Sequence, residues 1–433
     1  MEPQTLLRSA YMRVMTNPIR RSASHLSGMA RRLISRQPPT IEYFHQPDDP
    51  YSHLAVQRLR CMDRRYLVKI RPHLVSAPAA EFIGDSERYP AWALRDAQDI
   101  APYLDLDFPA EADAITPGRL QAFRQKLAAM LTSEDFATKA YELGQAFWSG
   151  EPLGGEPGMS RTATEARIQE ADSMRTRLGH YAGAMFYFEG EWYWGVDRLR
   201  HLEVRLRDMN LCHDAVTPLC AREPRFKSAT GANAANVTVE FFPSLRSPYT
   251  AISYVRVIDL VKRSGATLKL RPVMPMMMRG VPAPRAKGRY IMSDAKREAD
   301  AAGVPFGRIV DPFGEPINLA FSLYPWACER GKAVEYLGAY LGAAFSKGVN
   351  ITHEKGLQRV VESVGLNWEE GRKVLGKDGW QAELEANVNA MLADGLWGVP
   401  SFKVYGGTSQ DAYTTWGQDR LWRVETEIAS RAT

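Results

Sequence analysis

A serine and a threonine stand three residues apart in Ser247-Pro248-Tyr249-Thr250, shortly after the apolar run 237–242. The run predicts a buried strand, and the Ser-Pro pair predicts a helix start, where backbone N–H groups and the helix dipole stabilise negative charge. Cysteines at such positions form a redox pair, but two hydroxyl groups cannot form a disulfide. Two interpretations remain open, N-capping by Ser247 or binding of an anion such as a ligand thiolate.

The size and composition of the chain narrow its class. Its 433 residues are too many for one ordinary core, so two or three domains are expected. A content of 45% hydrophobic and 24% charged residues is typical of a soluble globular protein. The net charge of +5 suits a small anionic substrate, and no nucleic-acid motif occurs, so we expect no nucleic-acid partner. No apolar stretch predicts a membrane-spanning helix.

The four cysteines, at positions 61, 212, 220 and 328, include no Cys-x-x-Cys pair. We expect reduced thiols in a reducing compartment, and therefore a cytoplasmic protein that is not a dithiol oxidoreductase. The alternative is that Cys212 and Cys220 meet in a loop. Cys212, His213 and Cys220 lack a fourth ligand nearby, so no metal site is expected.

Residues 1–37 differ in composition from the rest. They contain seven arginines, no lysine and a single acid, Glu2. A segment of this kind is typical of an organelle presequence or of a helix lying on an anionic membrane surface. A flexible or partner-packed extension is the alternative. Pro38-Pro39 marks the end of this basic N-terminal extension.

The chain repeats itself. The block beginning at Thr40 aligns without a gap with the block beginning at Thr238, 198 residues later. Arg71-Pro72 matches Arg271-Pro272, and a Gly-x-Asp-Arg-Leu block recurs near the end of each copy. We therefore predict two copies of one domain, residues 38–210 and 237–433, joined by a linker at 211–236.

Each copy has the same predicted layout of strand, helix, strand, a long helical section, two short strands and a final helix. Arg-Pro is expected to end the second strand of each copy, because proline lacks an N–H donor. The predicted fold class is α/β, with two tandem domains that each carry a helical insertion. The expected strands are 41–44, 67–70, 185–188 and 192–194, then 237–242, 267–270, 401–405 and 413–416.

The second copy resembles the DsbA-like thioredoxin-fold family. Within that family it is most similar to the branch that contains 2-hydroxychromene-2-carboxylate isomerases and kappa-class glutathione transferases. The residues that carry the resemblance are Phe241-Phe242, Ser247-Pro248-Tyr249, Arg289-Tyr290 with Asp294 and Arg297, Gly398-Val399-Pro400-Ser401-Phe402, and Trp416-Gly417-Gln418-Asp419-Arg420-Leu421. The resemblance covers nearly all of residues 237–433 and is fainter in the first copy.

The resemblance implies a glutathione cofactor and a set of site residues. Ser247 would be catalytic, lowering the pKa of the glutathione thiol, and a cis peptide would precede Pro400. The cofactor-binding residues would be Tyr249, Thr250, Val399, Pro400, Gln418 and Asp419. Arg279, Arg289 and Tyr290 are the candidates for holding a carboxylate substrate, beside an apolar wall of methionines; a solvated basic loop is the alternative for this segment.

The first copy is expected to have lost this site. The alignment places Asp49 at Ser247, Ser52 at Thr250 and Ala184 at Pro400. An anionic Asp49 would repel a thiolate while still capping its helix, so this copy is predicted to have a structural or regulatory role.

The leading hypothesis is a glutathione-dependent isomerase or transferase that acts on a small electrophilic carboxylate, which we expect to be aromatic. The alternative is a non-catalytic thioredoxin-like protein that binds a peptide or a partner. Further expectations are a monomeric pseudo-dimer or a homodimer, and a membrane-surface or partner contact through residues 1–37.

Overall fold

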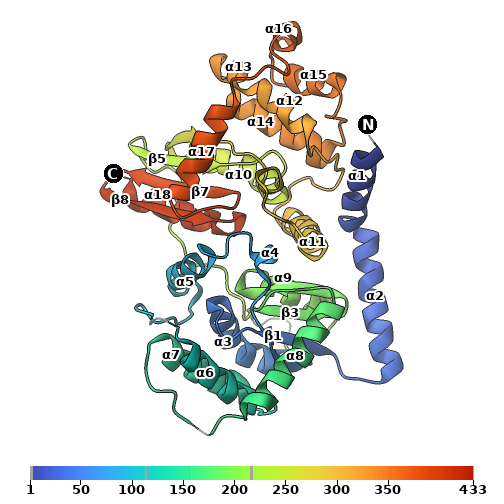
Figure 1. The fold of residues 1–433 in the computed structure, drawn as a ribbon, viewed down its shortest axis with the longest axis vertical. Coiled ribbons are helices and arrows are strands. Elements are labelled where there is room, and N and C mark those ends of the chain that lie inside the picture. Colours follow the sequence, from blue (N-terminus) through green and yellow to red (C-terminus); the bar gives the residue numbers. More distant parts are fainter. Residues whose placement is uncertain (1–2, 113–114, 156, 215–217, 433) are drawn as a thin grey trace. The chain divides into compact units, whose positions relative to one another are not determined.

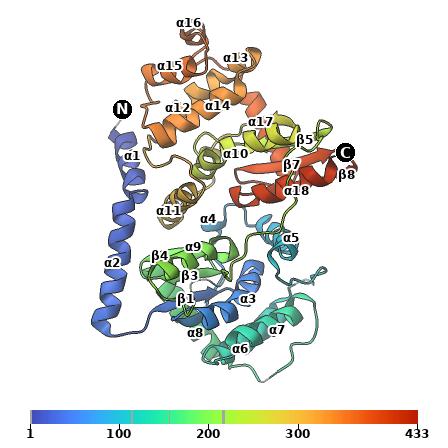
Figure 2. The ribbon, with the colours of Figure 1, turned by 180° about the vertical axis from the view of Figure 1, so that it is seen from behind.

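The computed structural model describes residues 3–112, 115–155, 157–214 and 218–432. Its contacts divide the chain into two compact units, residues 1–20 with 226–433 and residues 21–225. Figures 1 and 2 draw the ribbon from opposite sides. Each unit contains its own four-stranded sheet, so the protein combines helices with two separate sheets.

The N-terminal sheet has the strand order β2-β1-β3-β4, with β1 parallel to β2 and antiparallel to β3. Its strands are β1 (Thr40–His45), β2 (Lys69–Leu74), β3 (Met185–Phe188) and β4 (Glu191–Trp194). The helices are α2 (Pro18–Ser35), α3 (Pro50–Arg65), α4 (Ala80–Ile83), α5 (Tyr89–Ile100), η1 (Pro102–Leu104), α6 (Pro117–Met130), α7 (Phe136–Trp148), α8 (Arg161–Arg177) and α9 (Gly195–Asp208).

The C-terminal sheet has the order β6-β5-β7-β8, with the same parallel and antiparallel pairs at corresponding places. Its strands are β5 (Val237–Phe242), β6 (Thr267–Leu270), β7 (Ser401–Gly406) and β8 (Ser409–Trp416). The helices are α1 (Pro3–Met15), α10 (Pro248–Ser264), η2 (Met276–Arg279), α11 (Arg285–Ala301), α12 (Glu315–Ser322), α13 (Tyr324–Glu329), α14 (Ala333–Gly342), η3 (Ala343–Lys347), α15 (Glu354–Ser363), α16 (Trp368–Arg372), α17 (Gln381–Ala393), η4 (Gln418–Arg420) and α18 (Leu421–Arg431).

All eight predicted strands are present, and one expectation about their ends is wrong. β2 continues through Pro72 to Leu74, whereas β6 ends before Arg271 as expected. β2 is an edge strand, and the Lys69 N–H bonds to the Pro39 carbonyl on the β1 side. Because alternate residues face opposite sides of a strand, the Pro72 nitrogen points away from β1 and no ladder bond is lost.

The two sheets also share their registers. Thr40 pairs with Lys69 in the first sheet, and Thr238 pairs with Thr267 in the second. Both partners are therefore 198 residues apart, whereas the sequence alignment had matched Arg71 with Arg271, 200 residues later. The two arginines still lie on the same side of their sheets, because a shift of two residues preserves the face of a strand. Each one pairs with a strand glutamate, Arg71 with Glu42 and Arg271 with Glu240.

Candidate functional site

Ser247 is the N-cap of α10. Its side-chain oxygen accepts a hydrogen bond from the Thr250 N–H at 3.1 Å, and Pro248 occupies the first helical position. The cap residue is extended, as expected for a strand-to-helix turn, and its side chain is half-buried. The capping interpretation of Ser247 is therefore correct, and it leaves the hydroxyl accessible at the positive end of a 17-residue helix.

The segment before β7 lies against this helix start. The Val399-Pro400 peptide is cis, and the Ser247 hydroxyl is 3.4 Å from the Val399 carbonyl oxygen, to which it donates. Behind this segment, the Pro400 carbonyl accepts from the Gly417 N–H at 2.9 Å. Within the described residues, no hydrogen-bond acceptor is found for the Val399 N–H, and Val399 is half-buried. A donor in this position is suited to pairing with an extended peptide.

Thr250 is placed differently from Ser247. It is fully buried, and its hydroxyl accepts from the Ser244 N–H at 3.4 Å. The hydroxyl therefore fastens the loop that leads into α10, and the structure does not bring it to the surface beside Ser247.

Tyr249 and Tyr290 converge on one buried acid. The Tyr249 hydroxyl donates to Asp294 at 2.8 Å, and the Tyr290 hydroxyl donates to the other carboxylate oxygen at 3.3 Å. Arg297 forms an ion pair with the same carboxylate. Asp294 and Arg297 are both almost completely buried, so this cluster joins α10 to α11.

Gln418 and Asp419 lie where η4 meets α10 and α11. The Gln418 amide accepts from Arg256 at 3.1 Å and donates to Glu298 at 2.8 Å. The same amide also donates to Asp419. The predicted pair is thus brought together, within a network that reaches Arg256 in the third turn of α10.

The two predicted substrate arginines have different surroundings. Arg279 donates to the Met274 carbonyl at 3.1 Å and to the Trp397 carbonyl at 3.0 Å, and burial lowers its pKa. It therefore connects η2 to the segment that carries Val399. Arg289 is exposed on α11. Arg289 is consequently the one of the two whose guanidinium is open to solvent.

In the N-terminal unit the corresponding helix start is closed. Asp49 caps α3, and its carboxylate accepts from the Tyr51 N–H at 3.3 Å and from the Ser52 N–H at 3.1 Å. The Ser52 hydroxyl donates to Asp49 at 2.9 Å and accepts from the N–H groups of Gln46 and Ala184. A Cβ atom at position 183 would lie 2.4 Å from the Gln46 side chain. No room therefore remains above this helix start.

The charge expected at Asp49 needs correction. Burial raises the pKa of its carboxyl to about 7, against the opposing effect of its hydrogen bonds to Ser52 and Tyr51. Asp49 is therefore partly protonated near neutral pH, and we had expected an anion. Steric closure, rather than repulsion alone, makes this unit unsuited to holding a thiolate.

Sequence reasoning missed a cluster beside the candidate site. Arg246, the residue before Ser247, bonds to buried Asp311 at 2.8 Å, and Arg8 of α1 bonds to the same carboxylate at 2.6 Å. Both guanidinium groups lie over the ring of Phe313. Asp311 is 65 residues from one arginine and 303 from the other, and no sequence pattern signals such pairing.

The cysteines also differ from expectation. Cys61 on α3 and Cys220 form a disulfide, whereas Cys212 and Cys328 are free. The expectation of reduced thiols is wrong for this pair, and so is the alternative pairing of Cys212 with Cys220. A disulfide removes the argument for a reducing compartment that rested on free thiols, so the cytoplasmic location remains a prediction.

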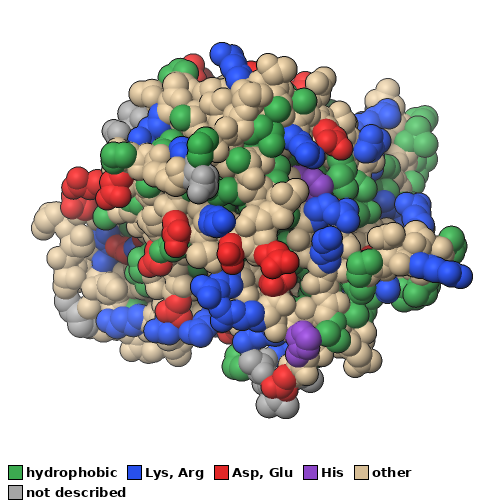
Figure 3. Space-filling model, turned by 90° about the horizontal axis from the view of Figure 1, so that it is seen from below, with side chains coloured by type: hydrophobic (Ala, Val, Ile, Leu, Met, Phe, Trp, Pro, Cys, Tyr) green, Lys and Arg blue, Asp and Glu red, His purple; other side chains and the backbone are tan. Residues whose placement is uncertain are grey.

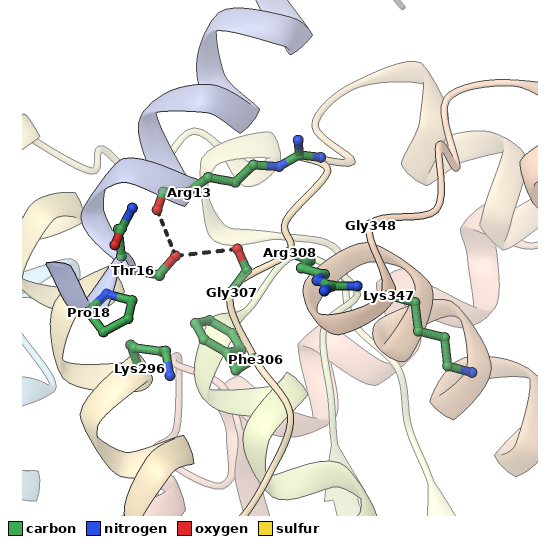
Figure 4. Close-up of a pocket in the computed structure, with 10 residues that line it drawn as sticks. Arg13, Thr16, Pro18, Lys296, Phe306, Gly307, Arg308, Lys347 and Gly348 are labelled. Carbon is green, nitrogen blue, oxygen red and sulfur yellow. Dashed lines mark hydrogen bonds between the residues drawn. The ribbon is translucent and has the colours of Figure 1, made fainter. Parts of the chain in front are cut away.

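A separate hollow of about 570 Å³ lies in the C-terminal unit, between the end of α1, α11 and η3. Figure 4 shows the Thr16 hydroxyl beside the Gly307 carbonyl at its centre, with Arg13 and Arg308 on one side and Lys296 on the other. None of the predicted site residues lines this hollow. It is therefore distinct from the Ser247 site.

The fold and the helix-start geometry define a class of domain. Residues 238–429 match the family model of the DsbA-like thioredoxin domain, so the C-terminal half contains such a domain. The comparison with curated proteins found no match for the chain.

Several solved structures are similar to part of the chain at low identity. One is a 2-hydroxychromene-2-carboxylate isomerase, with 19% identity, a TM-score of 0.38, and coverage of 45% of this chain and 95% of that one. A probable DsbA oxidoreductase from Streptomyces coelicolor has 20% identity, a TM-score of 0.35 and coverage of 46% and 92%. The cytosolic disulfide reductase DsbM from Pseudomonas aeruginosa, solved with GSH, has 17% identity, a TM-score of 0.33 and coverage of 45% and 99%.

Proposed function

We propose that the C-terminal unit binds glutathione at Ser247 and uses its thiolate as a nucleophile, as a glutathione-dependent isomerase or transferase. The observation that carries the proposal is the half-buried Ser247 hydroxyl, which lies at the start of α10 and 3.4 Å from the Val399 carbonyl. Positions 247 and 250 hold no cysteine, so the chain supplies no thiol there. A ligand must therefore bring the sulfur.

The helix start favours the ionised form of that sulfur. Its backbone N–H groups and the helix dipole stabilise an anion by about 0.3–2 kcal/mol, and a hydroxyl donor adds to this. A lower thiol pKa increases the fraction of glutathione that is nucleophilic at neutral pH.

The remaining predicted residues extend the site in two directions. The Val399 N–H is available to pair with the glutathione backbone, and Asp419 is the candidate for its γ-glutamyl amine. Gln418, the residue before Asp419, contacts Arg256, which lies nine residues beyond Ser247 on α10, so the Asp419 end of the site lies toward the third turn of that helix.

The proposed chemistry conserves atoms in both versions. The thiolate electron pair forms a C–S bond to the β-carbon of an unsaturated carboxylate, and the double-bond electrons move toward the conjugated carbonyl. In an isomerase, rotation about the new single bond precedes loss of the same thiolate, which restores the double bond. In a transferase, the adduct takes up one proton and leaves as a thioether. Arg289 is the candidate for holding the substrate carboxylate.

Calorimetry with two ligands tests the proposal. Glutathione should bind the wild type and release protons into the buffer at neutral pH, because the thiol pKa falls. S-methylglutathione has no ionisable thiol and should release none from that sulfur. Ser247→Ala should weaken glutathione binding about tenfold or more while changing S-methylglutathione binding little, because it removes a hydrogen bond to a charged atom.

Ser160→Ala is the matched control, since Ser160 caps α8 in the same way and lies in the other unit. It should leave binding of both ligands unchanged. Absence of binding heat from the wild type at millimolar glutathione would remove the proposal.

The alternative is a non-catalytic site for an extended peptide, and the Val399 N–H, which has no acceptor among the residues that the structure describes, favours it. In that case both ligands should bind equally, without proton release, and Ser247→Ala should affect neither.

We also propose that the two units derive from one duplicated thioredoxin-like domain. The shared strand order and the common 198-residue spacing of the β1–β2 and β5–β6 registers support this origin. The N-terminal unit, with its closed helix start, would then have a structural or regulatory role.

A further inference from the structure

Exposed apolar side chains are concentrated near the N-terminus. Of the fourteen large hydrophobic residues that are exposed in the described chain, eight lie between residues 6 and 34. They are Leu6, Leu7, Tyr11, Val14, Ile19, Leu26, Leu33 and Ile34. Single exposed apolar residues need no explanation, but a concentration on two short helices indicates a surface that another molecule covers.

Helix α2 packs on its own unit through a polar face. Arg21 and His25 pair with Glu191 at 3.0 and 2.6 Å, and Arg32 pairs with Glu189 at 2.5 Å. Gly28 allows close approach, since a Cβ atom there would lie 2.6 Å from the backbone of Glu189. These contacts attach one side of α2 to the turn between β3 and β4.

The opposite side of α2 carries an apolar stripe. We define this stripe as Ile19, Ala23, Leu26, Ala30 and Leu33, which follow one another at steps of four, three, four and three residues. At about 100° per residue, such steps keep all five within one narrow face, roughly opposite Gly28 and Arg32. All five are exposed, and no residue of α2 is fully buried. The packing of α2 therefore leaves its apolar face uncovered.

Helix α1 has the same division. Its Arg8 and Arg13 bond to Asp311 and to the Ile309 carbonyl. Leu7, Tyr11 and Val14, at steps of four and three, are exposed. Helix α1 docks by these polar contacts and by Met12 and Met15, which pack against the core of its unit, and it leaves Leu7, Tyr11 and Val14 open.

The charges on these helices indicate the chemistry of the missing partner. Residues 3–37 contain seven arginines and no acid. Arg20 and Arg31 lie about a quarter-turn from the stripe on α2, and Arg31 and Arg36 are exposed. Figure 3 shows basic and apolar side chains next to one another along one edge of the surface, on the side where Figure 1 draws α2. Pairing of two such stripes would bring arginines together without any acid to balance them.

We propose that α2 binds an anionic membrane surface, with the stripe among the outer acyl chains and the flanking arginines at the lipid phosphates. An apolar face bordered by arginines is the pattern of a helix that lies in the membrane interface. No helix in the described part of the chain is long and apolar enough to cross a membrane. The contact is therefore with the surface of the bilayer.

Vesicle flotation of the full-length chain tests this proposal. The protein should float with vesicles of 30% phosphatidylserine in phosphatidylcholine, and binding should fall at least several-fold with pure phosphatidylcholine or in 0.5 M NaCl. The double variant Leu26→Gln/Leu33→Gln should bind anionic vesicles at least about tenfold more weakly, since both side chains would otherwise leave water. Both residues are exposed, so the fold should be retained, as circular dichroism can verify.

Leu67→Gln/Val255→Gln is the matched control. It removes two exposed apolar residues outside the N-terminal helices and should bind vesicles as the wild type does. Failure of the wild type to float with anionic vesicles, or flotation that survives Leu26→Gln/Leu33→Gln, would overturn the proposal. So would a concentration-dependent dimer in sedimentation that this variant abolishes, because a second copy of the chain would then be the partner of the stripe.

Discussion

The Asp49→Asn substitution replaces a buried titrating carboxyl by a neutral amide of the same shape. Asparagine caps helices about as well as aspartate, and its one amide oxygen can keep the bond from the Ser52 N–H or from the Tyr51 N–H, which bond to different oxygens of Asp49. The lost bond acts at every pH, so the pH dependence of the difference between variant and wild type isolates the effect of ionisation on the stability of the N-terminal unit.

The direction of the effect follows from the pKa of Asp49. Burial raises it from 3.8 to about 7, so between these values the folded unit holds a proton that the unfolded chain has lost. The stabilisation by this proton is complete below about pH 4 and is lost as the pH rises through 7. A difference of about three in pKa corresponds to about 4 kcal/mol, all of which the wild type loses by pH 8.

Hydrogen–deuterium exchange of peptides from β1 and α3 measures the relevant opening free energy. The stability of Asp49→Asn relative to the wild type should rise by about 3 kcal/mol between pH 4.5 and pH 8. Asp49→Ala separates ionisation from capping, because it should be about 1 kcal/mol less stable than Asp49→Asn at every pH for the missing cap. An Asp49→Asn difference that is the same at pH 4.5 and at pH 8 would refute the reasoning.

Two further predictions concern the disulfide and the candidate site. Cys61→Ser should lower the unfolding free energy of the N-terminal unit by about 4 kcal/mol, because the bond to Cys220 closes a loop over a separation of 159 residues. Urea denaturation measures this loss. Cys328→Ser, which changes a free exposed thiol, should have no such effect. Gly398→Ala should lower the unfolding free energy by about 1–3 kcal/mol and weaken glutathione binding, because its Cβ would lie 2.4 Å from the Trp416 ring and displace the neighbouring Val399. Thermal melting measures the loss of stability, and calorimetry measures the loss of binding. Gly288→Ala, whose Cβ would have no atom within 4 Å, is the control.

The strands and helix starts were predictable because local patterns determine them. Aromatic and β-branched runs such as 237–242 predict buried strands, and Ser-Pro and Asp-Pro pairs predict helix N-termini at Ser247 and Asp49. The two-residue error in matching Arg71 with Arg271 has a simple cause. Sequence similarity aligns equivalent side chains, and here both arginines reach a strand glutamate from positions two residues apart.

Features that depend on distant contacts were not predictable. Nothing in the sequence indicates that Arg8 and Arg246 share Asp311, or that Cys61 reaches Cys220. The charge of Asp49 was misjudged for the same reason. Its pKa depends on burial, and burial depends on the Gln46 and Gly183 segments that pack above it.

The segments that lead into β3 and β7, rather than the caps, account for the difference between the two helix starts. Asp49 and Ser247 perform the same capping task, and either residue alone would leave N–H groups at the positive end of a helix. In the first unit, the Ser52 hydroxyl accepts from the N–H groups of both Gln46 and Ala184, so the segment before β3 is bonded to the helix start. In the second, the Thr250 hydroxyl accepts from the Ser244 N–H, the counterpart of the Gln46 N–H, but Pro400 stands in place of Ala184 and has no N–H to donate. The proline therefore removes the bond that attaches the neighbouring segment to the helix start in the first unit.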